Sequence, residues 1–420
     1  MPTIEIVLRC PVRSTFRVEQ VRGMFDLPEG ATEERLRVEL PDLSSRRWQL
    51  GLICGPSGSG KTTIARQLFP EAFAQPPRWP DDAAVIDAFA PLPAADAVGL
   101  LTAVGFSSPP GWLKPYRVLS NGERFRCDLA RALAEGAGEG DGRGGDFRTR
   151  GNGSAAPIVV FDEFTSVVDR TVAKVCSAAV AKAIRGGRVE RRFVAVTCHD
   201  DVIDWLAPDW VLDMAAREFS WRRLRRPPIR LRLARCPRRL WSVFARHHYL
   251  SGALNPTARC YAAFWDGRPT TFCATLHNAG KHRQRRITRL VTLPDYQGIG
   301  IGMAVAEAVA AWESADGTTV SLVTSHPAVI AHGQRSPRWR IGGFKRFGSR
   351  HGGLGTRGSL GRAVASLVYV GPAFRAAEAE FSPQTAAAGV DSMRRANQCP
   401  RGGLEEIDAE ERTVFPSPQE

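Results

Sequence analysis

Two kinds of apolar pattern predict strands in the first half of the chain. Residues 4–8 and 36–40 alternate between apolar and polar side chains, with the period of two expected for half-buried strands of an antiparallel sheet. Uninterrupted apolar runs predict buried strands, and these runs occupy residues 50–54, 157–161 and 193–197. We therefore expect a small antiparallel sheet followed by a buried sheet.

The second half of the chain alternates expected strands with expected helices. Residues 229–233 alternate between apolar and polar, and further strands are expected at 260–265, 270–276, 286–293 and 320–324. A short helix is expected from Leu240 and an alanine-rich helix over 303–312. Residues 372–420 are rich in Ala, Glu and Pro without periodicity, and they are expected to form a disordered tail.

Length and composition narrow the class of protein. A chain of 420 residues is too long for one ordinary core and predicts two domains. It has no apolar run of about 18 residues, and its first residues lack the pattern of a secretory signal. We therefore expect a cytoplasmic protein without a membrane partner. The nine cysteines include no C-x-x-C pair, which argues against a zinc ribbon and a disulfide framework.

The net charge of +14 is concentrated in the second half. Residues 211–371 hold 26 Arg and Lys residues against 7 Asp and Glu residues, so the rest of the chain is slightly acidic. Such an excess on one domain is typical of a protein that binds a polyanion. A solubilising basic surface is the alternative, and the arginine-rich stretch 217–239 could also be a disordered connector.

Residues 55–63 carry the clearest chemical signal in the chain. They follow the buried run at 50–54 and fit the pattern G-x-x-x-x-G-K-[ST] of a Walker A loop. In such a loop backbone N–H groups surround the phosphates, the lysine reaches the outer phosphates, and the next hydroxyl binds Mg²⁺. A glycine-rich turn without nucleotide is the alternative. The residues expected to bind ATP here are Gly55, Ser57, Gly58, Gly60, Lys61, Thr62 and Thr63, with Thr62 also binding Mg²⁺.

Four more motifs follow in a fixed order. The pentapeptide 119–123 opens a predicted helix over 124–133, a buried strand runs into Asp162 and Glu163, residues 166–169 follow, and the next buried strand runs into His199. Alone, the pentapeptide could be an ordinary capping box. Together with the Walker A loop, these stretches resemble the signature motif, Walker B, D-loop and switch histidine of ABC ATPases, over roughly residues 1–215.

The resemblance assigns a role to each motif. Asp162 would hold Mg²⁺ through water, Glu163 would polarise the attacking water, and His199 would sense the γ-phosphate. In this family the signature serine of one protomer completes the site of another, so a nucleotide-dependent homodimer is expected. Further ATP contacts are expected from Ser120, Gly122 and Asp169.

The chain departs from the ABC pattern in two ways. Asn121 replaces a glycine and Glu123 replaces the glutamine of the signature motif, although its serine and second glycine are kept. A glycine-rich stretch over 136–156 lengthens the spacing to the Walker B residues and is expected to be a flexible insert.

A second glycine-rich stretch follows the strand expected at 286–293. It spans residues 297–302 and opens the alanine-rich helix. A dinucleotide-binding turn is the alternative for such a short motif. The order of strand, glycine run and helix resembles the acyl-CoA site of GNAT acetyltransferases over roughly 229–371, where backbone N–H groups cradle the CoA pyrophosphate. The residues expected to bind acetyl-CoA or another acyl-CoA are Val291, Gln297, Gly298, Ile299, Gly300, Ile301 and Gly302.

The sequence leaves the general base for acyl transfer open. Arginines stand on the strand before the glycine run, where many GNAT relatives have a glutamate. His326 and Tyr249 are candidates by residue type, with His277 and Asp295 behind them. Each of the four could equally be a packed or surface residue.

Basic and aromatic residues in the second domain suggest a nucleic-acid acceptor. The residues expected to contact it are Arg338, Trp339, Arg340, Lys345 and Arg346. Simple acetyl transfer needs no ATP, whereas exposing a base in a duplex costs a few kcal/mol that ATP could supply. This half also distantly resembles the phage Mom-type DNA-modifying proteins.

The leading hypothesis is an ATP-hydrolysing acyltransferase that modifies a nucleobase, in DNA rather than RNA. One alternative is a protein or small-amine acetyltransferase with an ABC regulatory module, and another is a non-catalytic ABC clamp. The fold class is predicted as α/β. A P-loop ABC ATPase domain over 1–216 precedes a basic linker over 217–228, and a GNAT-type mixed-sheet α+β domain over 229–371 precedes the tail.

Overall fold

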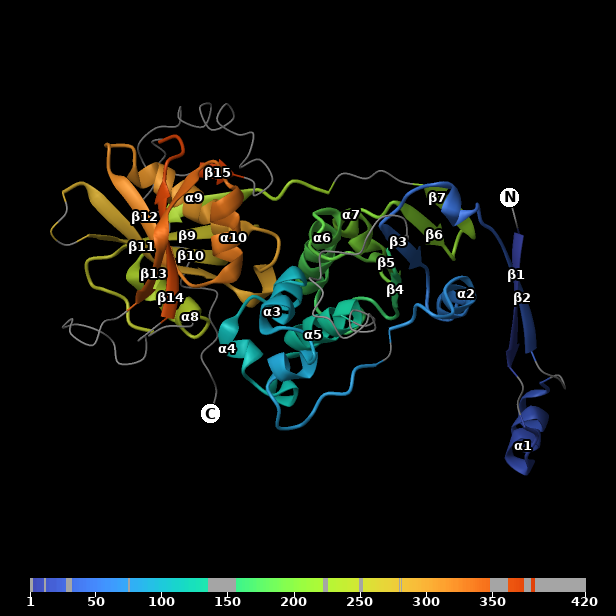
Figure 1. The fold of residues 1–420 in the computed structure, drawn as a ribbon. Helices are drawn as coiled ribbons and strands as arrows, with labels where there is room; N and C mark the ends of the chain where they lie inside the picture. The colour runs from blue at the N-terminus through green and yellow to red at the C-terminus, as the bar shows by residue number, and fades with distance from the viewer. Residues whose placement is uncertain are drawn as a thin grey trace. The chain divides into compact units, whose positions relative to one another are not determined.

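The computed structural model describes residues 3–10, 13–27, 32–74, 76–134, 156–221, 226–248, 252–278, 280, 282–347, 362–373 and 379–381. The chain forms two compact units (Figure 1). The first consists of Met1–Pro227 with the segments Arg246–Ser251 and Thr292–Ile301. The second consists of Pro228–Ala245, Gly252–Val291 and Gly302–Glu420. None of the helices in these described ranges is both long and apolar enough to cross a membrane.

The first unit is built on a sheet with the strand order β4-β5-β3-β6-β7. The strands are β3 (Leu50–Cys54), β4 (Ile158–Phe161), β5 (Arg192–Thr197), β6 (Trp210–Asp213) and β7 (Glu218–Trp221). The first four are parallel, and β7 is antiparallel to β6. The three apolar runs of the first half are β3, β4 and β5, so the prediction of buried strands is confirmed.

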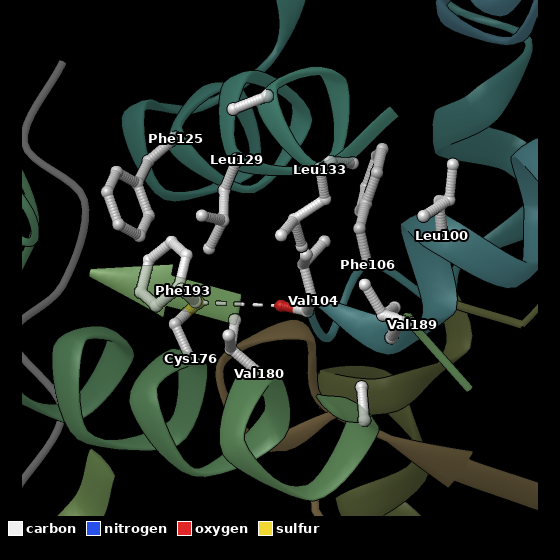
Figure 2. Packing of buried hydrophobic residues seen from close by; sticks show 14 of the residues in the cluster. Leu100, Val104, Phe106, Phe125, Leu129, Leu133, Cys176, Val180, Val189 and Phe193 are labelled. Carbon is white, nitrogen blue, oxygen red and sulfur yellow. Dashed lines mark hydrogen bonds between the residues drawn. The ribbon is translucent and has the colours of Figure 1, made fainter. Parts of the chain in front are cut away.

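Helices cover this sheet because the side chains of each strand alternate between its faces. The helices are α2 (Lys61–Leu68), α3 (Ala94–Ala103), α4 (Pro109–Trp112), α5 (Asn121–Ala134), α6 (Arg170–Arg185) and α7 (Ile203–Leu206). Leu50 and Leu52 of β3 join the buried cluster that α3, α5 and α6 also enter, whereas Ile53 joins a second cluster with α2. Figure 2 shows the first cluster, where the Cys176 thiol donates to the Val104 carbonyl at 3.6 Å.

The predicted antiparallel lead-in sheet is present. Strands β1 (Thr3–Cys10) and β2 (Thr32–Glu39) pair antiparallel along their whole lengths. Helix α1 (Phe16–Phe25) lies between them in sequence and has no buried residue.

At the start of the predicted linker over 217–228, residues 218–221 form β7. This strand pairs antiparallel with β6, and Phe219 stacks on Trp210 with ring centroids 5.9 Å apart. The glycine-rich insert predicted at 136–156 lies outside the described residues, except for Ala156.

The second unit contains a mixed sheet with the order β13-β14-β12-β11-β10-β9-β8-β15 (Figure 1). Its strands are β8 (Leu231–Arg235), β9 (Arg259–Trp265), β10 (Arg268–His277), β11 (Gln284–Thr292), β12 (Thr319–Thr324), β13 (Trp339–Phe347), β14 (Arg362–Tyr369) and β15 (Ala379–Phe381). The helices are α8 (Trp241–Ala245), α9 (Ile301–Glu313) and α10 (Pro327–Arg335). Residues 379–381, inside the predicted tail over 372–420, form β15 and pair with β8.

Strands β11 and β12 form a parallel pair that separates along its length. Their register runs from Gln284 opposite Thr319 to Ile287 opposite Leu322 and ends there, although β11 continues to Thr292. A parallel pair needs a crossover connection, and here α9 provides it. The end of β11 is therefore left unpaired with β12 just before the glycine-rich stretch.

Candidate functional sites

The Walker A loop connects β3 to α2 in a conformation that requires glycine. Gly55, Gly58 and Gly60 have φ angles of 146°, 79° and 82°, in the region that side chains disfavour. A Cβ at Gly55 would lie 3.0 Å from the Cβ of Met214. The glycines therefore allow the loop to curl at the amino end of α2, where unpaired N–H groups favour an anion.

Lys61 and Thr62 place a cation and a hydroxyl at this loop. The Lys61 side chain is only 8% exposed, and its Nζ donates to the Pro56 carbonyl at 2.6 Å. The Thr62 hydroxyl donates to Asp162 Oδ1 at 3.2 Å, which joins α2 to the end of β4. Hydroxyl and carboxylate oxygens are the ligands that Mg²⁺ prefers, so these residues fit the predicted metal. No group of three or more His, Cys, Asp or Glu residues suited to a metal occurs in the described part of the chain.

Glu163 follows Asp162 in a strained backbone conformation. Its φ is 51°, and its N–H donates to Asp162 Oδ1 at 3.0 Å. The Ser166 hydroxyl donates to Glu163 Oε2 at 2.6 Å, so a residue of the D-loop holds this exposed carboxylate. Left-handed non-glycine residues cluster at functional sites, which supports a chemical role for Glu163. The sequence did not single out Ser166 as its partner, because the contact depends on the turn between them.

His199 lies just after β5, beside an ion pair. Its N–H donates to the Thr197 hydroxyl at 3.1 Å, and its side chain is half-buried. Nearby, the Arg170 Nε donates to Asp201 Oδ2 at 3.0 Å. Partial burial raises the pKa of Asp201, but its hydrogen bond and charge interaction with Arg170 outweigh this and hold the pKa below the ordinary value. The pair ties the start of α6 to the segment that carries His199.

The signature pentapeptide forms the capping box that was its alternative interpretation. The Ser120 N–H and hydroxyl both donate to Glu123 Oε2 at 2.9 Å, and the Glu123 N–H donates to the Ser120 hydroxyl at 3.4 Å. The Ser120 residue is nevertheless exposed at the start of α5, so the cap and the predicted ATP contact are compatible. Asp169 caps α6 by accepting from the N–H groups of Thr171 and Val172.

The second glycine-rich stretch belongs to the first compact unit by its packing. A short 3₁₀ helix at Pro294–Tyr296 leads into it, and Gly298 and Gly300 have φ angles of 90° and 100°. The Gln297 amide NH₂ donates to the Thr292 carbonyl at 2.9 Å, which closes the turn before α9. The backbone therefore turns sharply into the amino end of α9, as the resemblance to an acyl-CoA loop implies. Val291 is buried at the end of β11.

The candidates for acyl transfer have different surroundings. His326 caps α10, because its Nδ1 accepts from the Ala328 N–H at 3.3 Å. His277 is exposed at the end of β10, and Tyr249 lies outside the described residues. Burial raises the pKa of Asp295 more than the nearby Arg126 lowers it. The contact with Ala328 gives His326 a capping role at α10.

The second unit contains a carboxylate and imidazole pair that the sequence did not predict. Glu307 of α9 is 3% exposed, and its Oε1 lies 2.8 Å from Nε2 of His332 on α10. Ser336 and Arg338 also donate to this carboxylate, at 3.0 and 3.3 Å. Burial raises the pKa of Glu307, but the hydrogen bond and charge interaction with His332, together with the other donors, hold it below the ordinary value. No sequence motif predicts the pair, because Glu307 and His332 are far apart in the sequence.

The predicted nucleic-acid contacts are divided between core and surface. Trp339 is 4% exposed and packs edge-on against Tyr369, with ring centroids 5.4 Å apart. Arg338 is bound to Glu307, whereas Arg340 and Lys345 are exposed on β13. The structure gives no side-chain surroundings for Arg346. A ring that is buried in this way is not accessible for the predicted stacking on a base.

Part of the positive charge of the second unit is neutralised internally. Glu313 is almost fully buried, and its Oε2 accepts from Arg259 at 2.8 Å. Its Oε1 lies 3.2 Å from the Arg285 Nε and accepts from the Tyr261 hydroxyl at 2.8 Å. Because a buried charge must be paired, the buried Arg285 serves the core and contributes little to a basic surface, whereas the Arg259 side chain pairs with Glu313 and stays 46% exposed.

No protein-family model matches the chain, and none of the curated proteins compared with it matches. Solved structures of two kinds each match a part of it. A bacterial Atm1-family ABC exporter with ATP bound is 16% identical, with a TM-score of 0.29, over 47% of this chain and 35% of that chain. A dimeric ATP-binding cassette in a post-hydrolysis state, bound to ADP and Pi, is 14% identical, with a TM-score of 0.31, over 44% of this chain and 88% of that one.

The other matches are acetyltransferases. An acetyltransferase from Bacillus subtilis in complex with CoA is 15% identical, with a TM-score of 0.26, and the match covers 34% of this chain and 97% of that chain. This chain spans about a third of the length of the matched exporter. The predicted α/β class is present in both units. The first has a mostly parallel sheet in which Thr62 of the Walker A loop contacts Asp162, and the second has a mixed sheet.

Proposed function

We propose that this chain is an ATP-hydrolysing, acyl-CoA-dependent acyltransferase that modifies a nucleobase, in DNA rather than RNA. The observation that carries the proposal is the contact of Thr62 with Asp162 beside Lys61 and Glu163, in a chain that also has a glycine-rich turn entering α9. The first group of residues suits phosphoryl chemistry, and the turn suits the phosphates of an acyl donor.

The hydrolytic role follows from the residues around the Walker A loop. Bound ATP and Mg²⁺ supply the phosphoryl group and its activation. The loop N–H groups bind the phosphates, and Lys61 exchanges the Pro56 carbonyl for phosphate oxygens. Thr62 and Asp162 provide oxygen ligands for Mg²⁺. Glu163, oriented by Ser166, polarises the attacking water, so most of the catalysis is positioning and electrostatic stabilisation.

The exposed signature motif supports a homodimer. Ser120 stands at the start of α5 with its hydroxyl already engaged with Glu123, and Asp169 caps α6. In the proposed dimer Ser120 and Gly122 of one protomer approach the γ-phosphate held by the other, and His199 senses it. ATP therefore joins the two protomers, and hydrolysis separates them.

The acyl-transfer role follows from the turn and the strands before it. Acetyl-CoA or another acyl-CoA supplies the activated acyl group. The N–H groups of residues 298–302 would bind its pyrophosphate at the amino end of α9, and the part of β11 near Val291 that does not pair with β12 would bind the pantetheine arm. Glycine at positions 298 and 300 permits the left-handed backbone that turns these N–H groups together.

The nucleobase acceptor is supported by the basic second half and by the pairing of an ATPase with an acyltransferase. Arg340 and Lys345 are exposed on β13 and can bind a phosphate backbone. Exposing a base costs a few kcal/mol, which a hydrolysing dimer can supply.

The test is a survey of acceptors with labelled acetyl-CoA, in the presence and absence of ATP. The candidates are duplex DNA, single-stranded DNA, tRNA, polyamines and a peptide pool. We expect label in DNA, with transfer to the duplex requiring ATP and transfer to single strands requiring it less. Label confined to amines or peptides would overturn the nucleobase assignment.

A second candidate function is acetylation of a protein or a small amine, with the ABC unit as a nucleotide sensor. The burial of Trp339 and the internal pairing of Arg338 favour it, because both remove predicted nucleic-acid contacts. In that case ATP changes the rate of transfer equally for every acceptor, including acceptors whose reactive group is freely accessible. A protein that binds ATP but no acyl-CoA would instead be a non-catalytic clamp.

A further inference from the structure

The segment Thr292–Ile301 is fastened to the first compact unit by polar contacts. The Ser107 N–H donates to the Gln297 side-chain oxygen at 2.8 Å. The Lys182 Nζ donates to the Ile299 carbonyl at 3.0 Å. Arg126, only 1% exposed, has its Nη2 atom 3.9 Å from the Asp295 carboxylate. All of these residues belong to the same compact unit, so the glycine-rich turn packs as a part of it.

The contact is close enough to exclude side chains on both sides. A Cβ on Gly298 would lie 2.7 Å from the Gly105 Cα and 2.9 Å from the Ala179 Cβ. A Cβ on Gly105 would in turn lie 2.8 Å from the Gln297 carbonyl oxygen. A Cβ on Gly300 would lie 2.7 Å from the Lys182 Nζ. Gly298 and Gly300 have no side chains, which would leave space for a phosphate. In this structure Gly105, Ala179 and Lys182 fill that space.

Two helices that contact the segment Thr292–Ile301 begin at nucleotide motifs. Arg126 lies on α5, whose first residues belong to the signature motif. Ala179 and Lys182 lie on α6, which Asp169 of the D-loop caps. Arg126 also keeps its Nε and Nη2 atoms buried without a hydrogen bond among the described residues, which is costly unless the contact with Asp295 offsets it. A movement of either motif would shift a rigid helix that touches the turn.

We infer that the nucleotide state of the ATPase unit controls acyl-CoA binding, with α6 covering the glycine-rich turn, and Arg126 of α5 contacting Asp295 before it, until ATP withdraws the two helices. The inference rests on the proposed function of that turn. In the described state the turn is covered, and acyl-CoA binding requires α6 and Gly105 to move away from it. ATP lowers this cost by drawing the signature motif and the D-loop toward the dimer interface. By thermodynamic linkage, acyl-CoA then tightens ATP binding by the same factor.

The test is calorimetric titration of the full chain with acetyl-CoA, with and without a saturating non-hydrolysable ATP analogue and Mg²⁺. We expect the analogue to tighten acetyl-CoA binding about fivefold or more, which is the usual lower range for coupled sites. Lys182→Ala should tighten binding in the absence of the analogue and reduce the effect of the analogue, because it removes the clasp on Ile299. Lys114→Ala, which changes an exposed lysine of the same unit, should leave both affinities unchanged.

The outcomes separate this inference from the proposed function. Equal acetyl-CoA affinity with and without the analogue overturns the inference and leaves the acyl-CoA site standing. Weaker binding by Lys182→Ala in both states overturns it as well, since Lys182 would then be a phosphate ligand. Absence of acetyl-CoA binding in every state removes both the inference and the proposed acyltransferase.

Discussion

At the scale of single residues, the nucleotide site depends on how the carboxylates at the end of β4 are held. Asp162 accepts from the Thr62 hydroxyl and from the Glu163 N–H, which fixes it at the position expected for Mg²⁺. The carboxylate of Glu163, whose backbone is left-handed, is not part of that contact. Its Oε2 accepts a hydrogen bond from the Ser166 hydroxyl instead. The two adjacent carboxylates thus have different partners, as the proposed division of roles between Mg²⁺ and the attacking water requires.

The first prediction concerns Glu163→Gln. It should abolish ATP hydrolysis while leaving ATP binding intact, because the phosphate cradle and the Mg²⁺ ligands are untouched. The variant should remain dimeric with ATP and Mg²⁺ on sizing chromatography, whereas Glu190→Gln, an exposed matched control, should hydrolyse ATP normally. A monomeric Glu163→Gln protein at saturating ATP would contradict the shared site.

The second prediction concerns the buried carboxylate of Glu307. Its folded pKa lies below the ordinary glutamate value of 4.5, so its contribution to stability is present above that value and is lost as the pH falls through the folded pKa. Glu307→Gln should therefore lower the thermal midpoint at neutral pH, and the difference from wild type should shrink below about pH 4.5. Thermal unfolding of both proteins from about pH 3 to about pH 8, in steps of about one pH unit, measures the difference between their midpoints. A constant difference across the range would show that the ion pair is not responsible.

At the scale of elements, the central strand β3 has a close neighbour that its sequence pattern does not reveal. A Cβ on Gly51 would lie 2.1 Å from the Trp210 ring on β6. The apolar run at 50–54 predicted a buried strand, and the strand is present. It could not predict which ring covers Gly51, because Trp210 is distant in the sequence and becomes a neighbour only when β6 joins the sheet.

The third prediction compares two glycines. Gly51→Ala should destabilise the first unit by about 1–3 kcal/mol, because the added methyl group overpacks against Trp210. Gly99→Ala on α3 meets nothing within 4 Å and should be neutral or stabilising by up to about 1 kcal/mol, because alanine favours helix. Urea denaturation followed by tryptophan fluorescence compares the two midpoints. Equal midpoints for the two variants would contradict the packing of Trp210 on β3.

At the scale of the whole molecule, motifs predicted the α/β fold class, whereas the acceptor inferred from composition stays a prediction. The Walker A loop and the glycine run at 297–302 each contain glycines with positive φ angles, so a short stretch of sequence is enough to predict each of them. The charge excess is a weaker guide to a surface, because Glu307 and Glu313 pair with Arg338 and Arg285, whose side chains are mostly buried. The packing of Thr292–Ile301 within the first unit could not be predicted either, because it depends on a fit between Gly298 and Gly105 that no motif encodes.

The fourth prediction concerns nucleic-acid binding by the second unit. Binding to duplex DNA should weaken with salt by about 0.9 log units per log unit of salt for each phosphate neutralised. Replacing Arg340 and Lys345 together with alanine should flatten that slope by about one or two units and leave acetyl-CoA affinity unchanged. Arg47→Ala, an exposed arginine of the first unit, is the control. Fluorescence anisotropy across a salt series measures the slope, and absence of binding at low salt would leave the exposed charges as a solubilising surface.

The central claim, that ATP hydrolysis and acyl transfer act together on a nucleobase, is tested most directly by mass analysis of nucleosides from cells that express the protein. Wild-type protein should produce a nucleoside that is heavier by one acyl group, found in DNA. Glu163→Gln and Gly300→Trp should each abolish it. The first stops hydrolysis, and the second puts a ring beside Lys182, where a Cβ would already lie 2.7 Å from the Nζ atom, in the turn proposed to bind acyl-CoA. Unmodified DNA and RNA nucleosides in cells that contain folded wild-type protein would contradict the account.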